Sequence, residues 1–365
     1  MGLPARIKLY TSLENKRGRP LIVYVTSTRA QAEAQIADNS IPEIVAQLQA
    51  LPSEATELDF CLVSNGGDGT VAWRIVSLIR ERVKKLSVLV PQAAFSAATL
   101  IALGADEIVM HPYGNLGPTD PQITNRSKNI QFGSQDLAAF LTFAKNEVGL
   151  TDQAPLLELF KKFSEEVGFV GIGVAARSAQ LSASMAEKLL RLHMKSDDQA
   201  QKAKVISEAL NTKFFHHGYP VSRTEATEIG LRIAPSDRET ESLLWNIWLD
   251  ISTELQLRQP FSPVQVLRDD PNCGAIFAPV PPGSPPVVPA PAKFANTTII
   301  VESSRRITHN IVEGEVGAVK TPDQKLNISV LTIRSKWEDI PIPQVDMGPT
   351  PMPAKAKYRK TSRKS

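Results

Sequence analysis

LDFCLVSNGGDG, at residues 58–69, carries the clearest indication of the fold. Its apolar first half is typical of a buried strand, and the glycines that follow predict a tight turn. A helical pattern comes next at 70–83, and a second apolar strand, LSVLVP, follows at 86–91. Strands that alternate with helices in this way favour stacked βαβ units with a largely parallel sheet.

The alternation continues on both sides of this stretch. PLIVYVTS at 20–27 is a strand candidate, and Ser40 with Glu43 forms a capping box in front of a helical pattern that reaches about Leu51. We expect a helix at 96–104, a strand at 107–112, and then helices at 134–148, 152–167, 174–196, 198–212 and 237–258. The predicted fold class is therefore α/β, with a helical C-terminal half.

The composition changes near residue 258 and divides the chain into four expected segments. Between Pro279 and Pro291, seven of thirteen residues are proline, which is typical of an extended linker. Two alternating stretches beyond it, at 297–303 and 326–333, predict strands. We expect an α/β domain at 1–258, a Pro-rich linker at 259–295, a small β-rich appendage at 296–340 and a disordered basic tail at 341–365.

The composition also excludes several classes of function. The net charge is only +3 over 365 residues, so no strong attraction to nucleic acid or to a membrane is expected, although the basic tail can contact nucleic acid or another acidic partner. The amino-terminal residues contain no apolar stretch that would serve as a signal peptide, and we expect a cytoplasmic protein. The histidines and the two cysteines do not cluster, so neither a metal nor a cofactor is expected.

A serine and two glycines are the candidate site residues of this region. Ser96 comes just after the strand at 86–91 and opens a short helix of small residues, from which its hydroxyl can project into a cleft. Gly66 and Gly67 carry no Cβ, so their backbone N–H groups can approach a reacting carbonyl closely. Each feature also has a simpler interpretation, since Ser96 can be a helix N-cap and the glycines can form only a turn.

Three motifs, in this order along the chain, resemble those of one family. They are SAATLIALGADEIVM at 96–110, LGPTDPQ at 116–122 and HHGYPVSRTEATEIGL at 216–231. Together they resemble the serine dehydrogenase proteinases, relatives of signal peptide peptidase A in the Clp protease and crotonase superfamily, whose second motif reads LGPVDPQ. The resemblance covers roughly residues 18–235.

This resemblance implies a crotonase-like or Clp-like spiral of βαβ units, serine peptidase activity on peptides or proteins, and assembly into a homo-oligomer. Ser96 would attack the peptide carbonyl, and the N–H groups of Gly66 or Gly67 and of Ala97 would stabilise the oxyanion. The serine needs a base to take its proton. Clp subunits use a histidine soon after the serine, but LGPTDPQ contains none, so a Clp-type triad is not expected.

Lysine is the base in peptidases similar to signal peptide peptidase A. Lys145 best fits the spacing that the resemblance implies, and Lys128 is the second candidate. A buried lysine can act as a base because desolvation lowers its pKa, but Lys145 can equally be an exposed lysine on an amphipathic helix. Asp120 is a candidate orienting group near Ser96. His216 and His217 can line the cleft or hold a turn, whereas structural or exposed positions are expected for His111, His193 and His309.

Two functions remain open from the sequence. The first is a serine peptidase with a dyad of Ser96 and Lys145, which the intact serine, the glycine pair and the order of the strands favour. The second is a catalytically weak scaffold or peptide-binding subunit of the same fold, which the absence of an assured base favours. A crotonase acting on an acyl-CoA thioester is a weaker third option, because neither a carboxylate base nor CoA-binding features are evident.

Overall fold

A computed structural model describes residues 2–125, 128–214 and 216–343. The largest element in this part of the chain is a seven-stranded sheet. In the order of the sheet, its strands are β12 (Leu326–Asp339), β11 (Ile307–Lys320), β10 (Ala292–Glu302), β1 (Leu21–Thr26), β2 (Glu57–Val63), β3 (Lys85–Val90) and β5 (Glu107–Met110). The last four pair in parallel, and helices connect them along the chain, which confirms the predicted α/β class.

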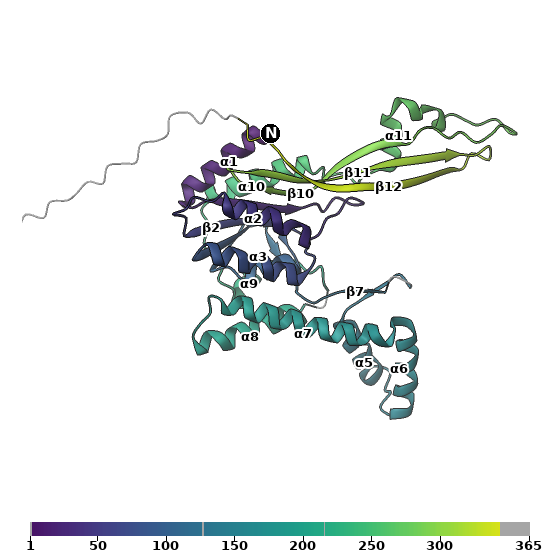
Figure 1. Ribbon diagram of the computed structural model, residues 1–365. Coiled ribbons are helices and arrows are strands. Elements are labelled where there is room, and N and C mark those ends of the chain that lie inside the picture. The colour runs from purple at the N-terminus through teal and green to yellow at the C-terminus, as the bar shows by residue number, and fades with distance from the viewer. Residues whose placement is uncertain (1, 126–127, 215, 344–365) are drawn as a thin grey trace, which may run out of the picture.

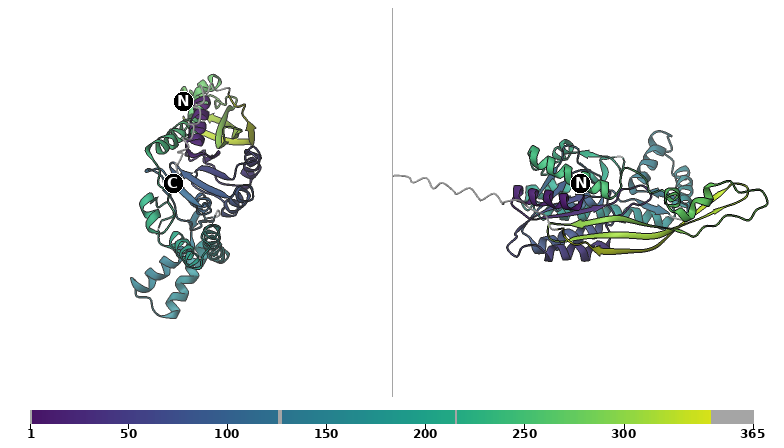
Figure 2. Two further views of the ribbon diagram at one scale, coloured as in Figure 1. Left: turned by 90° about the vertical axis from the view of Figure 1, so that its left-hand side faces the viewer. Right: turned by 90° about the horizontal axis from the view of Figure 1, so that it is seen from above.

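Helices cover both faces of this sheet (Figure 1, Figure 2). One face carries α2 (Ile41–Gln49), α3 (Gly69–Arg82) and α4 (Ala97–Leu103), and the other carries α1 (Leu3–Arg17) and α10 (Arg238–Glu254). Within β1, Ile22 and Tyr24 pack in the first layer, whereas Val23 and Val25 pack in the second. Because successive side chains of a strand point to opposite faces, strands covered on both sides are apolar throughout.

The strands expected as a C-terminal appendage extend the same sheet. β10 pairs antiparallel with β1, and β11 and β12 form a long antiparallel hairpin that projects from the body (Figure 1). Without β10, β1 would be an edge strand with unpaired backbone groups. The expected linker contains α11 (Pro263–Asp269) and the 3-10 helix η2 (Pro271–Phe277), so its helix-free part runs from 278 to 291. Of the expected tail, residues 344–365 lie outside the described residues.

Helices α5 to α8 lie below the sheet in Figure 1. α7 (Phe169–Arg191) contacts α3 and α4 and runs beside α8 (Asp197–Thr212), while α5 (Ser134–Asn146) and α6 (Gln153–Val167) contact α7. The smaller elements of the described chain are η1 (Asp38–Ser40), β4 (Ala93–Ala94), β6 (Asn115–Leu116), β7 (Ile123–Asn125), β8 (Ile130–Phe132), β9 (Val221–Ser222) and α9 (Arg223–Glu228). Across the described residues, every helix is too short or too polar to cross a membrane.

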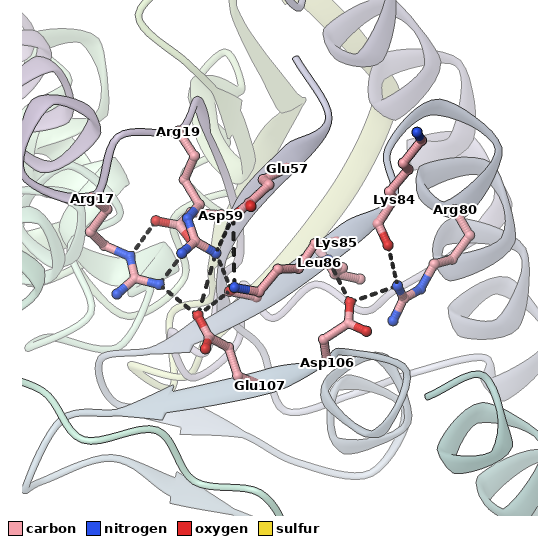
Figure 3. A network of polar contacts seen from close by, with 11 residues as sticks. Arg17, Arg19, Glu57, Asp59, Arg80, Lys84, Lys85, Leu86, Asp106 and Glu107 are labelled. Atoms are coloured by element: carbon pink, nitrogen blue, oxygen red, sulfur yellow. Dashed lines mark hydrogen bonds and ion pairs between the residues drawn. The ribbon is translucent and has the colours of Figure 1, made fainter. Parts of the chain in front are cut away.

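Charged side chains gather where the parallel strands begin (Figure 3). Arg17 bonds Asp59 of β2, and its Nη2 lies 3.2 Å from Glu107 Oε1 at the start of β5. Arg19 Nη1 lies 3.4 Å from the same oxygen. Burial raises the pKa of Asp59 despite its bond with Arg17. Ion pairs therefore occupy the side of the sheet at which the parallel strands begin. The opposite side, at which these strands end, is the one available for a ligand.

A buried charge cluster ties α1 to the C-terminal strands. Arg6 is fully buried, and its guanidinium donates to both oxygens of Glu302, at 2.7 and 2.9 Å, and to Asp250 on α10, at 2.8 Å. The Tyr10 hydroxyl donates to Glu302, and His309 Nε2 lies 2.6 Å from the same carboxylate. Burial by itself would raise the pKa of Glu302, but the hydrogen bond with His309 and the charge of Arg6 outweigh it and lower the pKa to about 2.

Candidate active site

The loop after β2 has a backbone conformation that glycine adopts far more readily than other residues. Gly66 and Gly67 have φ angles of 108° and 146°. The Ile36 N–H donates to the Gly66 carbonyl at 2.8 Å, and the Ile36 carbonyl accepts from the Asp68 N–H at 2.9 Å. A Cβ on Gly67 would lie 2.3 Å from the Ile36 oxygen, and one on Gly66 would lie 2.7 Å from the Cβ of Ser96. Gly66 therefore lets this loop approach Ser96 directly, and Gly67 lets it pack against the backbone of Ile36.

Ser96 has a strained backbone at the start of α4. Its φ of 53° and ψ of −117° are uncommon for a residue with a side chain, a strain that costs on the order of 1–3 kcal/mol and is frequent at active sites. The surrounding turn is held by the Phe95 N–H, 2.9 Å from the Ser64 carbonyl, and by the Thr99 hydroxyl, 2.7 Å from the Ala94 carbonyl. The Ser96 side chain caps no N–H group of α4. Its hydroxyl is therefore available to a ligand.

Two backbone N–H groups beside Ser96 are also available. Those of Gly67 and Ala97 have no acceptor within the described part of the chain, and both residues line the same cavity as Ser96. By contrast, the Gly66 N–H donates to the Ser64 hydroxyl at 3.0 Å. Of the three residues expected to form the oxyanion site, Gly67 and Ala97 offer free donors, whereas Gly66 stabilises the loop.

A cavity with a volume of about 430 Å³ opens in front of Ser96. Its walls are formed by the glycine loop, the start of α4, the 119–124 segment, β8 and α7. Much of the wall is polar but uncharged: Gln35, Asn65, Gln122, Thr124, Gln131 and Ser178. Among the described residues that line it, the ionisable ones are His217 and Asp68, which caps α3 by accepting from the Thr70 N–H at 2.7 Å. The cavity is large enough for more than one side chain of a peptide.

His217 brings an oriented imidazole to this cavity. It lies in the loop between α8 and β9, and its Nδ1 is 2.9 Å from Oδ1 of Asp120. Asp120 is only 7% exposed, and its other oxygen accepts from Gln122 Nε2 at 2.8 Å. Nε2 of His217 has no partner among the described residues. Ser96 and an imidazole that is paired with a carboxylate thus lie along one cavity.

The two lysines expected as bases lie elsewhere. Lys145 is exposed near the end of α5, and Lys128 is exposed in the β7–β8 connection, where its Nζ lies 2.9 Å from Glu166 Oε2. Neither lysine is among the residues that line the cavity with Ser96. The structure therefore brings together Ser96, Gly67 and Ala97 of the expected site, with Gly66 behind them, but places Lys145 and Lys128 outside it.

The other histidines occupy separate positions. His216 lies in a different cavity beside Phe214, and its Nδ1 accepts from the Gly218 N–H at 3.0 Å. His111 stacks on Trp245 with ring centroids 4.9 Å apart, and burial lowers its pKa. The sequence indicated Asp120 as a group that orients another residue near Ser96. It gave no indication that Asp120 pairs with His217. Within the described residues, no three His, Cys, Asp or Glu side chains are placed to hold a metal ion.

Part of this chain matches a known protein family. Residues 34–131 match the family model described as ClpP-like SDH-type serine proteinase. This range contains the glycine loop, Ser96 and LGPTDPQ, so the resemblance to that family is confirmed there. Two uncharacterised proteins of Methanocaldococcus jannaschii are similar over a longer range. One is 24% identical over 62% of this chain and 71% of its own length, and the other is 27% identical over 63% and 73%.

Solved structures of one protease also show similarity. They are two mutants of the 1510-N membrane-bound stomatin-specific protease, one with a serine replaced by alanine and one with a lysine replaced by alanine in complex with a substrate peptide. The identities are 16% and 17%, and both TM-scores are 0.36. The similarity covers 60% of this chain and 82% or 78% of the protease chain.

Proposed function

We propose that this protein is a serine peptidase in which Ser96 is the nucleophile and His217 is the base. Asp120 orients the imidazole, and the N–H groups of Gly67 and Ala97 bind the oxyanion. One observation carries the proposal: Ser96 shares a cavity with an imidazole whose Nδ1 is already paired with a buried carboxylate. The match of residues 34–131 to a family of serine proteinases supports the same reaction class.

The reaction would proceed through an acyl-enzyme. As Ser96 Oγ bonds to the peptide carbonyl carbon, its proton passes to His217 Nε2, and the carbonyl oxygen takes the negative charge toward the Gly67 and Ala97 N–H groups. The C–N bond then breaks, and the imidazolium returns the proton to the leaving amine. A water molecule attacks the ester next, with His217 as the base again, and releases the acid and free Ser96.

Lys145 is the alternative base, and it requires a rearrangement of α5 because it does not line the cavity here. Substitution separates the two bases, because His217→Ala and Lys145→Ala each remove one candidate and leave the other in place.

A serine-directed fluorophosphonate probe tests the proposal. The wild-type protein should be labelled at Ser96 and should cleave a mixed peptide library, whereas Ser96→Ala should do neither. Labelling that persists in Ser96→Ala would refute the nucleophile. A folded wild-type protein that is neither labelled nor active on peptides would instead support the scaffold function.

We also propose a homo-oligomer that forms through the arm of α5, α6 and the start of α7. Large apolar side chains on this arm are more than half exposed: Phe143, Val148, Leu157, Phe169 and Val170. Soluble monomers seldom expose many such side chains in one region. Light scattering after size-exclusion chromatography should give a multiple of 39.9 kDa, and a strict monomer at micromolar concentration would contradict this. A cytoplasmic location stays a prediction.

A further inference from the structure

Asp68 brings a carboxylate to a cavity whose wall is otherwise largely uncharged. It follows Gly67 in the chain, is exposed, and lines the same cavity as Ser96. Among the described residues that line this cavity, the other ionisable side chain is that of His217, which is already paired with Asp120. The negative charge of the cavity wall therefore belongs to Asp68.

Capping of α3 uses only one oxygen of this carboxylate. Oδ1 accepts from both the N–H and the hydroxyl of Thr70, each at 2.7 Å. Oδ2 has neither a hydrogen bond nor an ion pair within the described residues. Arg74, one turn further along α3, pairs instead with Asp38 at 3.4 Å. Because a carboxylate can accept about four hydrogen bonds, Asp68 retains acceptors for a ligand in the cavity.

An apolar surface lies directly beside this carboxylate. Gly69 is the next residue, and a Cβ there would lie 2.9 Å from Cε of Met185 and 3.2 Å from Cδ1 of Leu100. Both of these side chains line the cavity as well. The start of α3 thus presents a carboxylate next to a thioether and a leucine side chain. Lysine and arginine side chains match this surface, because each has an apolar stem that ends in a cationic group.

Asp68 is also close to the reacting bond of the proposed mechanism. There the Gly67 N–H binds the carbonyl oxygen of the substrate, and Asp68 is the residue bonded to Gly67. A substrate group that reaches Asp68 therefore belongs to a residue near the scissile bond.

We propose that Asp68 determines specificity by binding a positively charged group of the substrate near the scissile bond. The inference rests on the proposed peptidase function. The apolar stem of a lysine or arginine would lie on Leu100 and Met185, and its cationic end would pair with Oδ2 of Asp68. The free α-ammonium group of a short peptide carries the same charge and is the second source of this chemistry. An acidic side chain at this position would be repelled.

Peptides that differ by one charge test the inference. Each is acetylated at its amino terminus and carries lysine or Nε-acetyllysine at one position before or after the scissile bond, which mass spectrometry of the products locates. Acetylation of the side chain keeps the stem and removes the charge. For the wild-type protein, kcat/KM should be higher for lysine by about fivefold or more at one position, because the acetylated side chain lacks the charged hydrogen bond. This ratio should fall as salt is added, since salt screens exposed charges.

Two variants identify the carboxylate. Asp68→Asn removes the charge but keeps the cap of α3, because asparagine caps helices about as well as aspartate. The ratio should then fall to about one. The control is Asp38→Asn, since Asp38 is an exposed carboxylate that pairs with Arg74 of α3 and does not line the cavity. It should keep the wild-type ratio. A ratio is unaffected if part of a variant is unfolded, because both rates fall together.

Peptides without the amino-terminal acetyl group distinguish the two sources of the cation. A preference that appears only with the free amine, and that is lost in Asp68→Asn, would assign the α-ammonium group to Asp68. A wild-type protein without a preference for the cation in either set of peptides, or a preference that Asp68→Asn retains, overturns the inference and leaves the peptidase in place. If no peptide is cleaved and Ser96 is not labelled, the proposed function fails and the inference fails with it.

Discussion

Asp120 and His217 are 97 residues apart in the chain, yet Oδ1 of the first lies 2.9 Å from Nδ1 of the second. The other oxygen of Asp120 accepts from Gln122, so both carboxylate oxygens are paired. This arrangement directs Nδ1 of His217 toward the carboxylate and leaves Nε2 of the same ring able to accept a proton. Ser96 lines the same cavity as His217.

Substitutions in this pair should lower peptidase activity without unfolding the protein. His217→Ala removes the proposed base, and Asp120→Asn removes the charge proposed to orient it. Loss of a general base typically lowers the rate about 10²–10⁴-fold, and we expect both variants to fall in that range. The measurement is kcat on a peptide substrate, with circular dichroism to verify the fold.

The matched control is Lys145→Ala, because Lys145 is exposed and lies outside the cavity. This variant should keep activity within a few fold of the wild type. A loss of orders of magnitude in Lys145→Ala, with His217→Ala nearly normal, would show that the lysine is the base and that the imidazole is structural.

Gly66→Ala should damage both the fold of the loop and the active site. An added Cβ would lie 2.7 Å from the Cβ of Ser96 and 2.8 Å from the Phe95 carbonyl, at a φ of 108° that alanine rarely adopts. We expect a loss of roughly 1–3 kcal/mol in stability, together with weaker labelling of Ser96 by the fluorophosphonate probe.

Gly173→Ala is the control for this change. Gly173 lies within α7 with open space around it, so alanine should be neutral or stabilise the protein by about 0.5–1 kcal/mol. Chemical denaturation of the three proteins gives the comparison. Equal effects of the two substitutions would show that the close approach of Gly66 to Ser96 has no energetic consequence.

Local sequence patterns predicted the parts of the site that adjoin the parallel strands. The strand at 58–64 and the helix at 96–104 appear within a residue or so of their expected positions, and with them the glycine loop and Ser96. The pairing of Asp120 with His217 could not be predicted, because it depends on how the loop after α8 returns to the 116–122 segment. Lys145 was favoured instead because of its spacing from Ser96 along the chain. Spacing along the chain does not determine the distance between two side chains in the fold.

Two elements of the fold were also beyond the sequence patterns. α1 was not expected, because it places the charged Arg6 in the core among Tyr10 and Leu13. From sequence alone an arginine is expected at the surface, because a buried arginine needs a charged partner. The partner of Arg6 is Glu302, which lies 296 residues away in the chain. The pairing of β10 with β1 could not be predicted either, because these strands are also far apart in the sequence.

The buried pair of Arg6 and Glu302 should be essential for stability. Arg6→Met keeps much of the side-chain length but removes the guanidinium from a buried carboxylate, which typically costs about 3–5 kcal/mol. The control is Lys161→Met, because Lys161 and Glu158 form an exposed pair that contributes about 1 kcal/mol or less. Equal losses of unfolding free energy in the two variants would contradict the importance of the buried cluster.

The same cluster predicts a loss of stability in acid. The pKa of Glu302 is about 2 in the folded protein and ordinarily 4.5, so the unfolded chain binds the proton more readily. Its contribution is therefore fully present above about pH 5 and is lost as the pH falls toward 2. In Arg6→Met the carboxylate loses a cation that lowers its pKa, so the decline of stability between these pH values should be less steep than in the wild type.

Limited proteolysis tests how the C-terminal strands are attached. The segment at 281–291 is largely exposed and rich in proline, and a protease should cut there first. We expect the two products to elute together under native conditions, because β10 pairs with β1 and Glu302 bonds Arg6 across the cut. In denaturant they should separate. A stable amino-terminal fragment that ends near 260–280 and elutes alone would show instead that residues after 291 are dispensable for the fold.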